Sequence, residues 1–393
     1  MRATPVFAGP PGERTSTLIW PDLQCGVWHI PAKEAGNLTR PAIASRLVSA
    51  ARSDAGRAHG PLLTVRGLRT SLQTAQGVIV AVDGVSFDIA SGEVLGIVGE
   101  SGCGKSVTAL SILGLLPPSA GADVEGAVRF GGHDLLQLPE SEMRRLRGNE
   151  ISIIFQEPMT SLNPLLKVGT QITEPLTVHR AMDSRAAKAR ALDLLDQVGV
   201  PAPARRFDEY PHQLSGGLRQ RVMIAMALAC EPKLLIADEP TTALDVTTQS
   251  QILDLLVSLQ QRSGMAVILI SHDLGVMAEF ADRVLVMYAG HVVEQASAIE
   301  LFRSPLHPYT EALLGSIPVV DSTERRLTVI DGAVPSPWEI VPGCRFRPRC
   351  RFAEAPCESA VPPLLRLRPE HSAACIRHVG YQLDSSALPA GRR

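Results

Sequence analysis

Short apolar runs alternate with amphipathic stretches through the middle of the chain. Three runs, Val94–Val98, Leu234–Ala237 and Ala266–Ile270, consist almost entirely of apolar residues. Such runs, about four to eight residues long, are typical of strands buried on both faces. The segment Gln249–Ser263 instead has the period of a helix, and its apolar face is formed by Ile252, Leu255, Leu256 and Leu259. Strands that alternate with helices predict an α/β fold around a mainly parallel sheet.

Strictly alternating segments precede this core. They predict strands at Leu62–Arg66, Val78–Val82 and Val85–Ile89, and a hairpin where Ala127–Phe130 is followed by two glycines. We therefore expect an antiparallel β edge on the parallel sheet.

A helical segment lies between the apolar runs. Ser184 is a suitable N-cap for a helix that ends at Gly199, and we expect Pro117 and Pro118 to end the helix that follows the first apolar run. The sequence thus predicts an inserted helical subdomain at about residues 157–228.

Composition divides the chain into three parts. Residues 1–60 have no sustained period and predict a disordered extension, or a start codon placed too far upstream. Residues 61–300 carry the α/β pattern, and residues 301–393 form a proline-rich extension with four cysteines.

Charge and hydropathy exclude several classes of protein. The 393 residues are 45% hydrophobic and 20% charged, with a formal net charge of −2, which argues against a dedicated nucleic-acid binder. No apolar run approaches the roughly 18 residues of a membrane span. The first residues lack an apolar secretory core, so we expect a cytosolic protein whose seven cysteines are reduced or metal-bound.

The strongest chemical signal follows the first apolar run. The pattern G-x-x-x-x-G-K-S, between a strand and a helix, predicts a phosphate-binding loop. Glycines let backbone amides converge on phosphate oxygens, and the helix directs its positive end at the same anion. We expect Lys105 to neutralise the phosphates and Ser106 to hold Mg²⁺. The residues expected to surround the nucleotide are Gly99, Glu100, Ser101, Gly102, Cys103, Gly104, Lys105, Ser106 and Val107. Cys103 is interpreted as filler that points away from the phosphates.

Polar residues also end three other predicted strands. They are Gln156, Asp238, Glu239 and His272. Ligands of parallel sheets lie at the carboxyl ends of strands, so these side chains should meet the phosphates. We expect Asp238 and Gln156 to contact Mg²⁺, Glu239 to polarise the attacking water, and His272 to contact the γ-phosphate or that water. Taken alone, His272 would more often be a structural histidine.

Ser215, Gly216 and Gly217 open a predicted helix. By itself this triplet is an ordinary glycine-rich N-cap turn, although a helix N-terminus also binds anions.

Taken together, the motifs between Leu62 and Glu294 resemble the ATP-binding cassette family. Gly99–Ser106 is similar to its Walker A loop, Leu214–Gln220 to its signature loop, Leu234–Glu239 to its Walker B strand and Ala243–Asp245 to its D-loop. Gln156 and His272 match the Q-loop and switch residues. The resemblance implies a P-loop NTPase cassette with a RecA-like sheet core, which hydrolyses ATP with Lys105, Gln156, Glu239 and His272.

The resemblance also implies a partner. Cassettes of this family close head to tail on two ATP molecules, with Ser215–Gly217 and Asp245 at the interface. The chain has one set of motifs, so it needs a second cassette, a paralogue in preference to a copy of itself. One departure is the absence of an aromatic residue near Gln76, where the family often stacks adenine.

The segments Leu301–Thr310 and Gln156–Pro164 resemble the dipeptide, oligopeptide and nickel permease ATPases. This resemblance implies a subunit bound peripherally to the cytoplasmic face of the inner membrane. Its partners would be two transmembrane permease subunits and, indirectly, an extracytoplasmic substrate-binding protein. The cargo would be a peptide, with nickel or another small solute as the alternative. A soluble cassette ATPase acting on nucleic acid or ribosomes is disfavoured by both segments.

Four cysteines follow in the extension: Cys344, Cys350, Cys357 and Cys375. They are either scattered structural thiols or metal ligands, and their spacing is looser than that of most zinc sites. Some peptide-permease ATPases carry a [4Fe–4S] cluster in a similar pattern, so we expect that cluster in preference to zinc. Four arginines interleave with the first cysteines and would offset the charge of a cluster or form a solvated face: Arg345, Arg347, Arg349 and Arg351.

Overall fold

The computed structural model describes residues 60–156, 161–242, 244–316, 330–339 and 342–378. All of these fall within the contact-defined unit that spans residues 44–393. The predicted N-terminal extension, except Gly60, lies outside the described residues.

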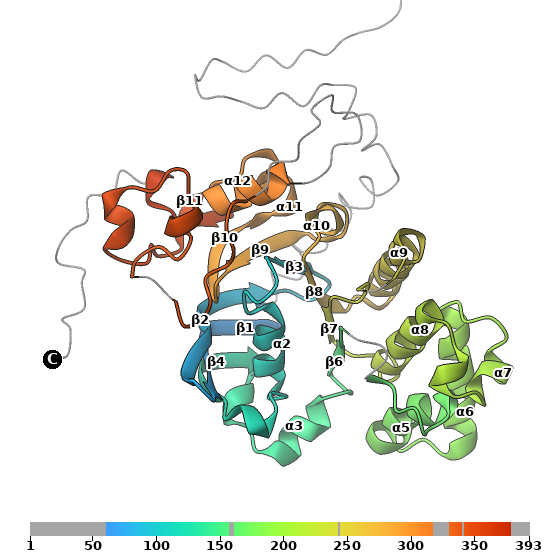
Figure 1. The fold of residues 1–393 in the computed structure, drawn as a ribbon. Helices are drawn as coiled ribbons and strands as arrows, with labels where there is room; N and C mark the ends of the chain where they lie inside the picture. Colours follow the sequence, from blue (N-terminus) through green and yellow to red (C-terminus); the bar gives the residue numbers. More distant parts are fainter. Residues whose placement is uncertain (1–59, 157–160, 243, 317–329, 340–341, 379–393) are drawn as a thin grey trace, which may run out of the picture. The chain divides into compact units, whose positions relative to one another are not determined.

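The core is a sheet of eight strands in the order β11-β12-β10-β9-β3-β8-β7-β6 (Figure 1). The strands β9, β3, β8, β7 and β6 pair in parallel, as predicted. Four of them, β3, β7, β8 and β9, are buried along their whole length, which explains the nearly continuous apolar sequence of these strands. The bounds are β3 Val94–Val98, β6 Ile151–Ile154, β7 Leu234–Asp238, β8 Ala266–Ser271, β9 Arg283–Tyr288, β10 His291–Ser297, β11 Leu365–Arg368 and β12 His371–Ala373.

The antiparallel edge is a second sheet of four strands in the order β2-β1-β4-β5. The sequence predicts two strands at Val78–Val82 and Val85–Ile89, but the structure has one continuous strand there. The alternation of apolar and polar residues is interrupted around Asp83. The strand continues there because its register against β1 is irregular at that point. The bounds are β1 Leu63–Thr74, β2 Gly77–Ile89, β4 Asp123–Phe130 and β5 His133–Asp134, and β4 and β5 form the predicted hairpin.

Helices α5 to α8 pack against one another and form the predicted helical subdomain (Figure 1). The remaining helices flank the sheets. The bounds are α2 Lys105–Leu113, α3 Glu140–Leu146, α5 Val168–Arg180, α6 Ser184–Gln197, α7 Pro203–Phe207, α8 Gly216–Ala227, α9 Val246–Ser263, α10 Leu274–Phe280, α11 Ala298–Arg303 and α12 Pro308–Gly315.

Two predicted helix ends are corrected by the structure. Helix α2 ends at Leu113, four positions before Pro117, because Gly114 adopts a left-handed conformation (φ 59°) and caps it. Helix α6 is capped by Asp183, not Ser184, because the Asp183 carboxylate accepts hydrogen bonds from the amides of Arg185 and Ala186, the second and third residues of the helix.

The C-terminal extension is continuous with the core. Strand β12 pairs with β10, so the extension completes one edge of the main sheet. Tyr309 and Phe346 are buried in the same apolar cluster as β3 and β9. Within the described parts of the chain, no helix is both long and apolar enough to cross a bilayer.

Candidate functional site

The loop between β3 and α2 forms a tight turn over the sheet. A side chain at Gly99 would collide with the carbonyl of Met287, and one at Gly104 would lie 2.5 Å from the carbonyl oxygen of Ala81. Gly104 also has a φ of 102°, which side chains rarely adopt. The glycines therefore allow the loop to lie against the neighbouring β9–β10 turn and β2.

Lys105 is folded back over this loop. Its ammonium group donates to the carbonyl oxygens of Gly99, at 2.8 Å, and Glu100, at 3.2 Å. It also lies 4.0 Å from Oε1 of Glu239 and is 5% exposed. The ammonium charge is thus held inside the loop, where it can meet an incoming anion.

Asp238 ends β7 beside the start of α2. Its Oδ1 accepts a hydrogen bond from Oγ of Ser106 at 3.0 Å. Burial raises the pKa of Asp238, whereas the Ser106 hydroxyl and the Lys105 charge act in the opposite direction. A hydroxyl and a carboxylate in contact form a donor set of hard oxygens that suits Mg²⁺.

The carboxylate of Glu239 is the centre of the site. Its Oε2 accepts hydrogen bonds from Nε2 of Gln156 at 3.0 Å and from Oγ1 of Thr242 at 2.9 Å. Nδ1 of His272 lies 3.3 Å from the same oxygen. The backbone of Glu239 has a φ of 45°, which costs energy in a residue other than glycine and is common at functional sites. Side chains from three strand ends and the following loop thus orient one carboxylate.

These groups border a cavity of about 280 Å³. Its polar wall comes from the glycine loop, Gln156 and Glu239, and its apolar wall comes from β2 and the C-terminal extension. The apolar and small lining residues are Leu72, Ile79, Val80, Ala81, Ala289, Gly290, Pro335 and Pro337. The cavity therefore offers anion-binding groups on one side and a hydrophobic surface on the other.

Most of the predicted nucleotide residues lie at this cavity. Ser101, Gly102, Gly104, Lys105, Ser106, Val107, Gln156 and Glu239 line it. Cys103 is fully buried, as the filler interpretation predicts, and burial raises the pKa of its thiol.

Ser215, Gly216, Gly217 and Asp245 do not line this cavity. Ser215 caps α8, and its Oγ accepts from the amide of Leu218 at 3.4 Å. Asp245 caps α9, where the hydrogen bond from the amide of Thr248 lowers the pKa of its carboxyl group. A side chain at Gly217 would come within 2.9 Å of the Thr248 methyl group, so the two caps lie side by side.

Sequence reasoning missed three residues that contact the loop or the central carboxylate. Thr242 contacts Glu239, and Arg349 and Tyr309 contact Glu100. Only Thr242 had a usable signal, because it lies three residues after Glu239.

The four cysteines of the extension line one cavity of about 20 Å³. Burial raises the pKa of the Cys344 and Cys350 thiols and raises that of Cys375 to about 11. Their donor chemistry suits zinc or an iron–sulfur cluster. As placed in the described part of the chain, however, no group of three or more His, Cys, Asp or Glu residues is arranged to hold a metal ion.

The interleaved arginines have separate roles. Arg345 pairs with Asp83 and Arg349 pairs with Glu100, and both guanidinium groups are buried. Arg345 and Arg349 therefore do not form the predicted solvated face. Their charges are paired with carboxylates, and not with a cluster as the alternative prediction has it. Arg351, which is 67% exposed and pairs with Glu311, fits the solvated face.

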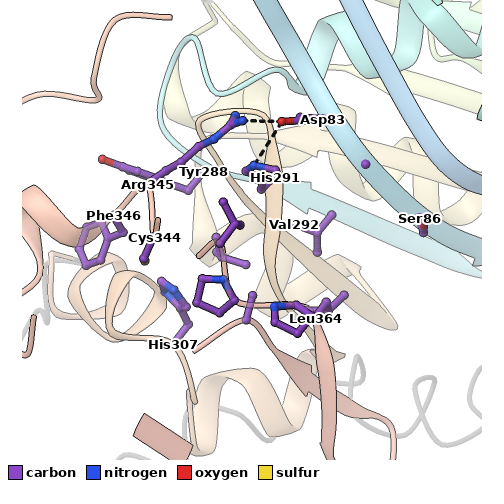
Figure 2. A pocket seen from close by; sticks show the side chains of 16 residues that line it. Asp83, Ser86, Tyr288, His291, Val292, His307, Cys344, Arg345, Phe346 and Leu364 are labelled. Carbon is purple, nitrogen blue, oxygen red and sulfur yellow. Dashed lines mark hydrogen bonds and ion pairs between the residues drawn. The ribbon is translucent and has the colours of Figure 1, made fainter. Parts of the chain in front are cut away.

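A larger cavity of about 450 Å³ lies between the extension, β2 and β10 (Figure 2). At one end of the cavity, Oδ2 of Asp83 pairs with Nη2 of Arg345 at 2.5 Å. The same oxygen lies 3.6 Å from Nε2 of His291. Burial and the Arg345 charge lower the pKa of His291 from 6.5 to about 4. The imidazole is thus held neutral although a carboxylate is close.

Two family models match separate parts of the chain. The ABC transporter model matches residues 82–242, and the model for the C-terminal region of oligopeptide/dipeptide transporters matches residues 293–357. The first covers the glycine loop and both carboxylates, and the second covers Arg349 and three of the four cysteines.

Curated relatives match most of the chain. A probable peptide ABC transporter ATP-binding protein of Sinorhizobium fredii is 54% identical over 80% of this chain and 95% of its own length. The oligopeptide transport ATP-binding protein AppD of Bacillus subtilis is 52% identical, over 80% of this chain and 96% of its own.

Solved cassettes share the fold. The ATP-binding cassette MJ0796, in a dimeric post-hydrolysis state bound to ADP and phosphate, is 31% identical with a TM-score of 0.54. The match covers 60% of this chain and 98% of that one. A cassette from Clostridium perfringens, described as part of an ABC transporter complex, is 30% identical with a TM-score of 0.52, over 62% of this chain and 91% of that one.

Proposed function

The chain belongs to the ATP-binding cassette ATPases of the oligopeptide/dipeptide transporter group, and from this premise we propose that it drives peptide import by hydrolysing ATP. One observation carries the proposal: the Glu239 carboxylate lies beside Lys105 and is hydrogen-bonded by side chains that sense bound phosphate in this family. The peptide cargo is inferred from the similar proteins of Sinorhizobium fredii and Bacillus subtilis, which are named as peptide and oligopeptide transport proteins.

The residues divide the work of phosphoryl transfer. The loop amides and Lys105 would bind the β- and γ-phosphates, and Ser106 and Asp238 would hold a Mg²⁺ ion that neutralises their charge. Glu239 accepts the proton of a water whose oxygen bonds to the γ-phosphorus. The bond from that phosphorus to the bridging oxygen breaks, which releases ADP and phosphate. His272 and Gln156 hold the carboxylate towards the water.

The base of ATP would lie on the apolar wall of the cavity. Ile79 and Val80 occupy the β2 side and Pro335 and Pro337 the extension side, and none of the four is aromatic. Packing between aliphatic surfaces then replaces the aromatic stacking that is absent near Gln76.

A second cassette completes the enzyme in this proposal. Ser215–Gly217 and Asp245 lie beside one another outside the cavity, as expected of residues that contact the ATP of a partner. The dimeric state of the similar cassette MJ0796 supports such an arrangement. We propose a paralogue as the partner, in a heterodimer.

Two transmembrane permease subunits are the proposed membrane partners. An extracytoplasmic binding protein would deliver the peptide to these subunits and is therefore an indirect partner. The segment after Gln156 and the first helix of the helical subdomain expose large apolar side chains. Leu165 is 82% exposed and Val178 is 70% exposed. Exposed apolar groups of this size suit a docking surface, which supports the proposal that this face of the cassette meets the permease subunits at the cytoplasmic side of the inner membrane.

The four cysteines are proposed to hold a metal group, a [4Fe–4S] cluster in preference to zinc. The support is that four residues spread over 32 positions line one small cavity. A cavity of about 20 Å³ has room for about one water and is too small for a cluster, so the loops would have to open outwards to admit one. The group would staple the extension and takes no part in hydrolysis.

The experiment reconstitutes the two ATPases, the two permeases and the binding protein in proteoliposomes. We expect ATP-dependent uptake of labelled di- and oligopeptides by the wild-type assembly and none with Glu239→Gln. Uptake of nickel but not of peptides would refute the proposed peptide cargo, while the proposed ATPase activity would stand. Absence of ATP hydrolysis in the wild-type assembly would refute the function itself.

A further inference from the structure

A partly buried ion pair, in which the Glu100 side chain is 29% exposed, joins the C-terminal extension to the glycine loop. Nη1 and Nη2 of Arg349 donate to Oε2 and Oε1 of Glu100 at 2.6 and 3.0 Å. The Arg349 side chain is only 5% exposed. Two parallel hydrogen bonds between planar groups fix orientation as well as distance. Glu100 is the second residue of the loop, so its side chain is held from outside the cassette.

Arg349 is itself held in place by its own domain. It donates to the backbone carbonyls of Asp331 at 2.9 Å and of Ile330 and Gly332 at 3.3 Å. Its guanidinium group also lies 3.4 Å from the hydroxyl of Tyr288. A guanidinium with this many partners has a single position, so the carboxylate that it binds has one too.

The backbone of Glu100 has a second anchor in the extension. Its amide donates to the hydroxyl of Tyr309 at 2.9 Å. Tyr309 is fully buried and packs edge-on against Tyr288, with ring centroids 4.6 Å apart. The carbonyl of Glu100 in turn accepts from Lys105. The amide, the carbonyl and the carboxylate of Glu100 therefore all have partners. The partners of the amide and the carboxylate, Tyr309 and Arg349, belong to the C-terminal extension.

Arg345 reaches the same loop through one intermediate. It donates to the carbonyl of Ala289 and pairs with Asp83. The next residue, Gly290, donates from its amide to the carbonyl of Cys103 at 2.9 Å. Arg345 thus holds a turn that supports the far side of the glycine loop.

We propose that Arg349 and Arg345 are positioning residues of the ATP site, which brace the glycine loop from the segment bracketed by Cys344 and Cys350. The loop binds phosphate with backbone amides, and amides bind well only when they are aimed in advance. Loss of Arg349 also leaves the Glu100 carboxylate uncompensated near the phosphates, where it repels them. The inference rests on the proposed function in taking this loop as the ATP site.

The test compares four full-length variants with the wild type: Arg349→Ala, Glu100→Gln, the double variant, and Arg351→Ala as the matched control. Arg351 lies two positions from Arg349 but makes an exposed ion pair. The measurements are equilibrium binding of a fluorescent ATP analogue to the single chain, and KM and kcat in the assembled transporter.

We expect Arg349→Ala to weaken nucleotide binding and raise KM about tenfold, because the partly buried Glu100 carboxylate loses its paired charge and its fixed position beside the loop. The kcat should change little, since no contact of Glu239 is lost. The double variant should recover most of the affinity, because it has no unpaired carboxylate, and Arg351→Ala should bind as the wild type does.

Equal affinity of Arg349→Ala and Arg351→Ala would overturn the proposal. So would a double variant that binds no better than Arg349→Ala, because loss of packing alone does not depend on the Glu100 charge. If Arg349→Ala does not fold, Arg349→Lys keeps the charge without the bidentate geometry and should show a smaller rise in KM. These outcomes can be told apart from a failure of the proposed function, because that failure would appear as an absence of ATP hydrolysis in the wild-type assembly.

Discussion

The side-chain amide of Gln156 donates to Oε2 of Glu239 at 3.0 Å, although the two residues lie on different strand ends. Since Gln156 precedes the segment proposed to contact the permease, this bond would link the proposed membrane contact to the proposed catalytic base. A displacement of Gln156 would therefore change the orientation of the proposed base.

Glu239→Gln should stop turnover while ATP binding persists. A glutamine keeps the contacts of the carboxylate but cannot accept the proton of the attacking water, so we expect kcat to fall about a thousandfold, within the range of general-base catalysis. The Kd for ATP should stay within about twofold, because Lys105 and the loop are unchanged. Glu279→Gln, at an exposed position, is the matched control. Undiminished hydrolysis in Glu239→Gln would remove this residue as the base.

Thr242→Val tests the orientation of the same carboxylate. The Thr242 hydroxyl donates to Oε2 of Glu239 at 2.9 Å. A hydrogen bond to a charged group contributes about 1.5–3 kcal/mol, so its loss should lower kcat roughly tenfold or more with little change in KM. Thr242→Ser restores the hydroxyl and should restore most of the rate. If Thr242→Ser is as slow as Thr242→Val, the hydroxyl is not what matters.

The convergence of Gln156, Asp238, Glu239 and His272 was predictable because local pattern alone locates strand ends. Parallel strands present their carboxyl ends at one edge, so residues far apart in sequence meet there once each strand is recognised. In the structure Gln156 and His272 contact Glu239, whereas Asp238 contacts Ser106 beside it. The helical subdomain was predictable for the same reason, since amphipathic period is a local property.

The brace on the glycine loop was not predictable. Arg349 and Glu100 are 249 positions apart and belong to no shared periodic pattern. The same holds for β12, a strand of three residues whose place in the sheet depends on pairing with β10 and β11. Short elements are positioned by tertiary contacts, and a single sequence carries little signal for these.

Glu294→Ala should destabilise the junction between the cassette and the extension. Glu294 is fully buried, and its carboxylate accepts from the amides of Leu306 at 2.7 Å and His307 at 2.9 Å. It also lies 2.7 Å from Nε2 of His371 in β12. Removing it leaves buried donors without an acceptor, so we expect a loss of about 3 kcal/mol in urea unfolding. Glu279→Ala, on the surface, should cost less than about 0.5 kcal/mol. Equal losses for the two variants would contradict this role.

His291 should make the protein sensitive to mild acid. Its pKa is lowered to about 4 in the folded chain by burial and by Arg345, with Asp83 acting in the opposite direction. The unfolded chain therefore binds a proton first, and the stability contributed by the neutral imidazole is complete above pH 6.5 and is lost as pH falls towards 4. The loss should reach at most about 3 kcal/mol. His291→Gln cannot titrate, so its stability should decline less over this window. Parallel pH curves for the two proteins would exclude His291 as the source.

Metal analysis decides the role of the four cysteines. On protein purified without oxygen, we expect about four irons with matching acid-labile sulfide per chain if a [4Fe–4S] cluster is bound. Cys357→Ser should lose that iron and, because Cys344 and Cys350 bracket the brace, should also bind ATP more weakly than the wild type. Cys230→Ser is the control, because Cys230 lies in the helical subdomain and contacts the carbonyl of Pro175. One zinc per chain would support a structural metal site that holds the extension together, and it would exclude a redox role. Neither metal in folded protein would leave the thiols as packing residues, and the brace would then depend on Arg345 and Arg349 alone.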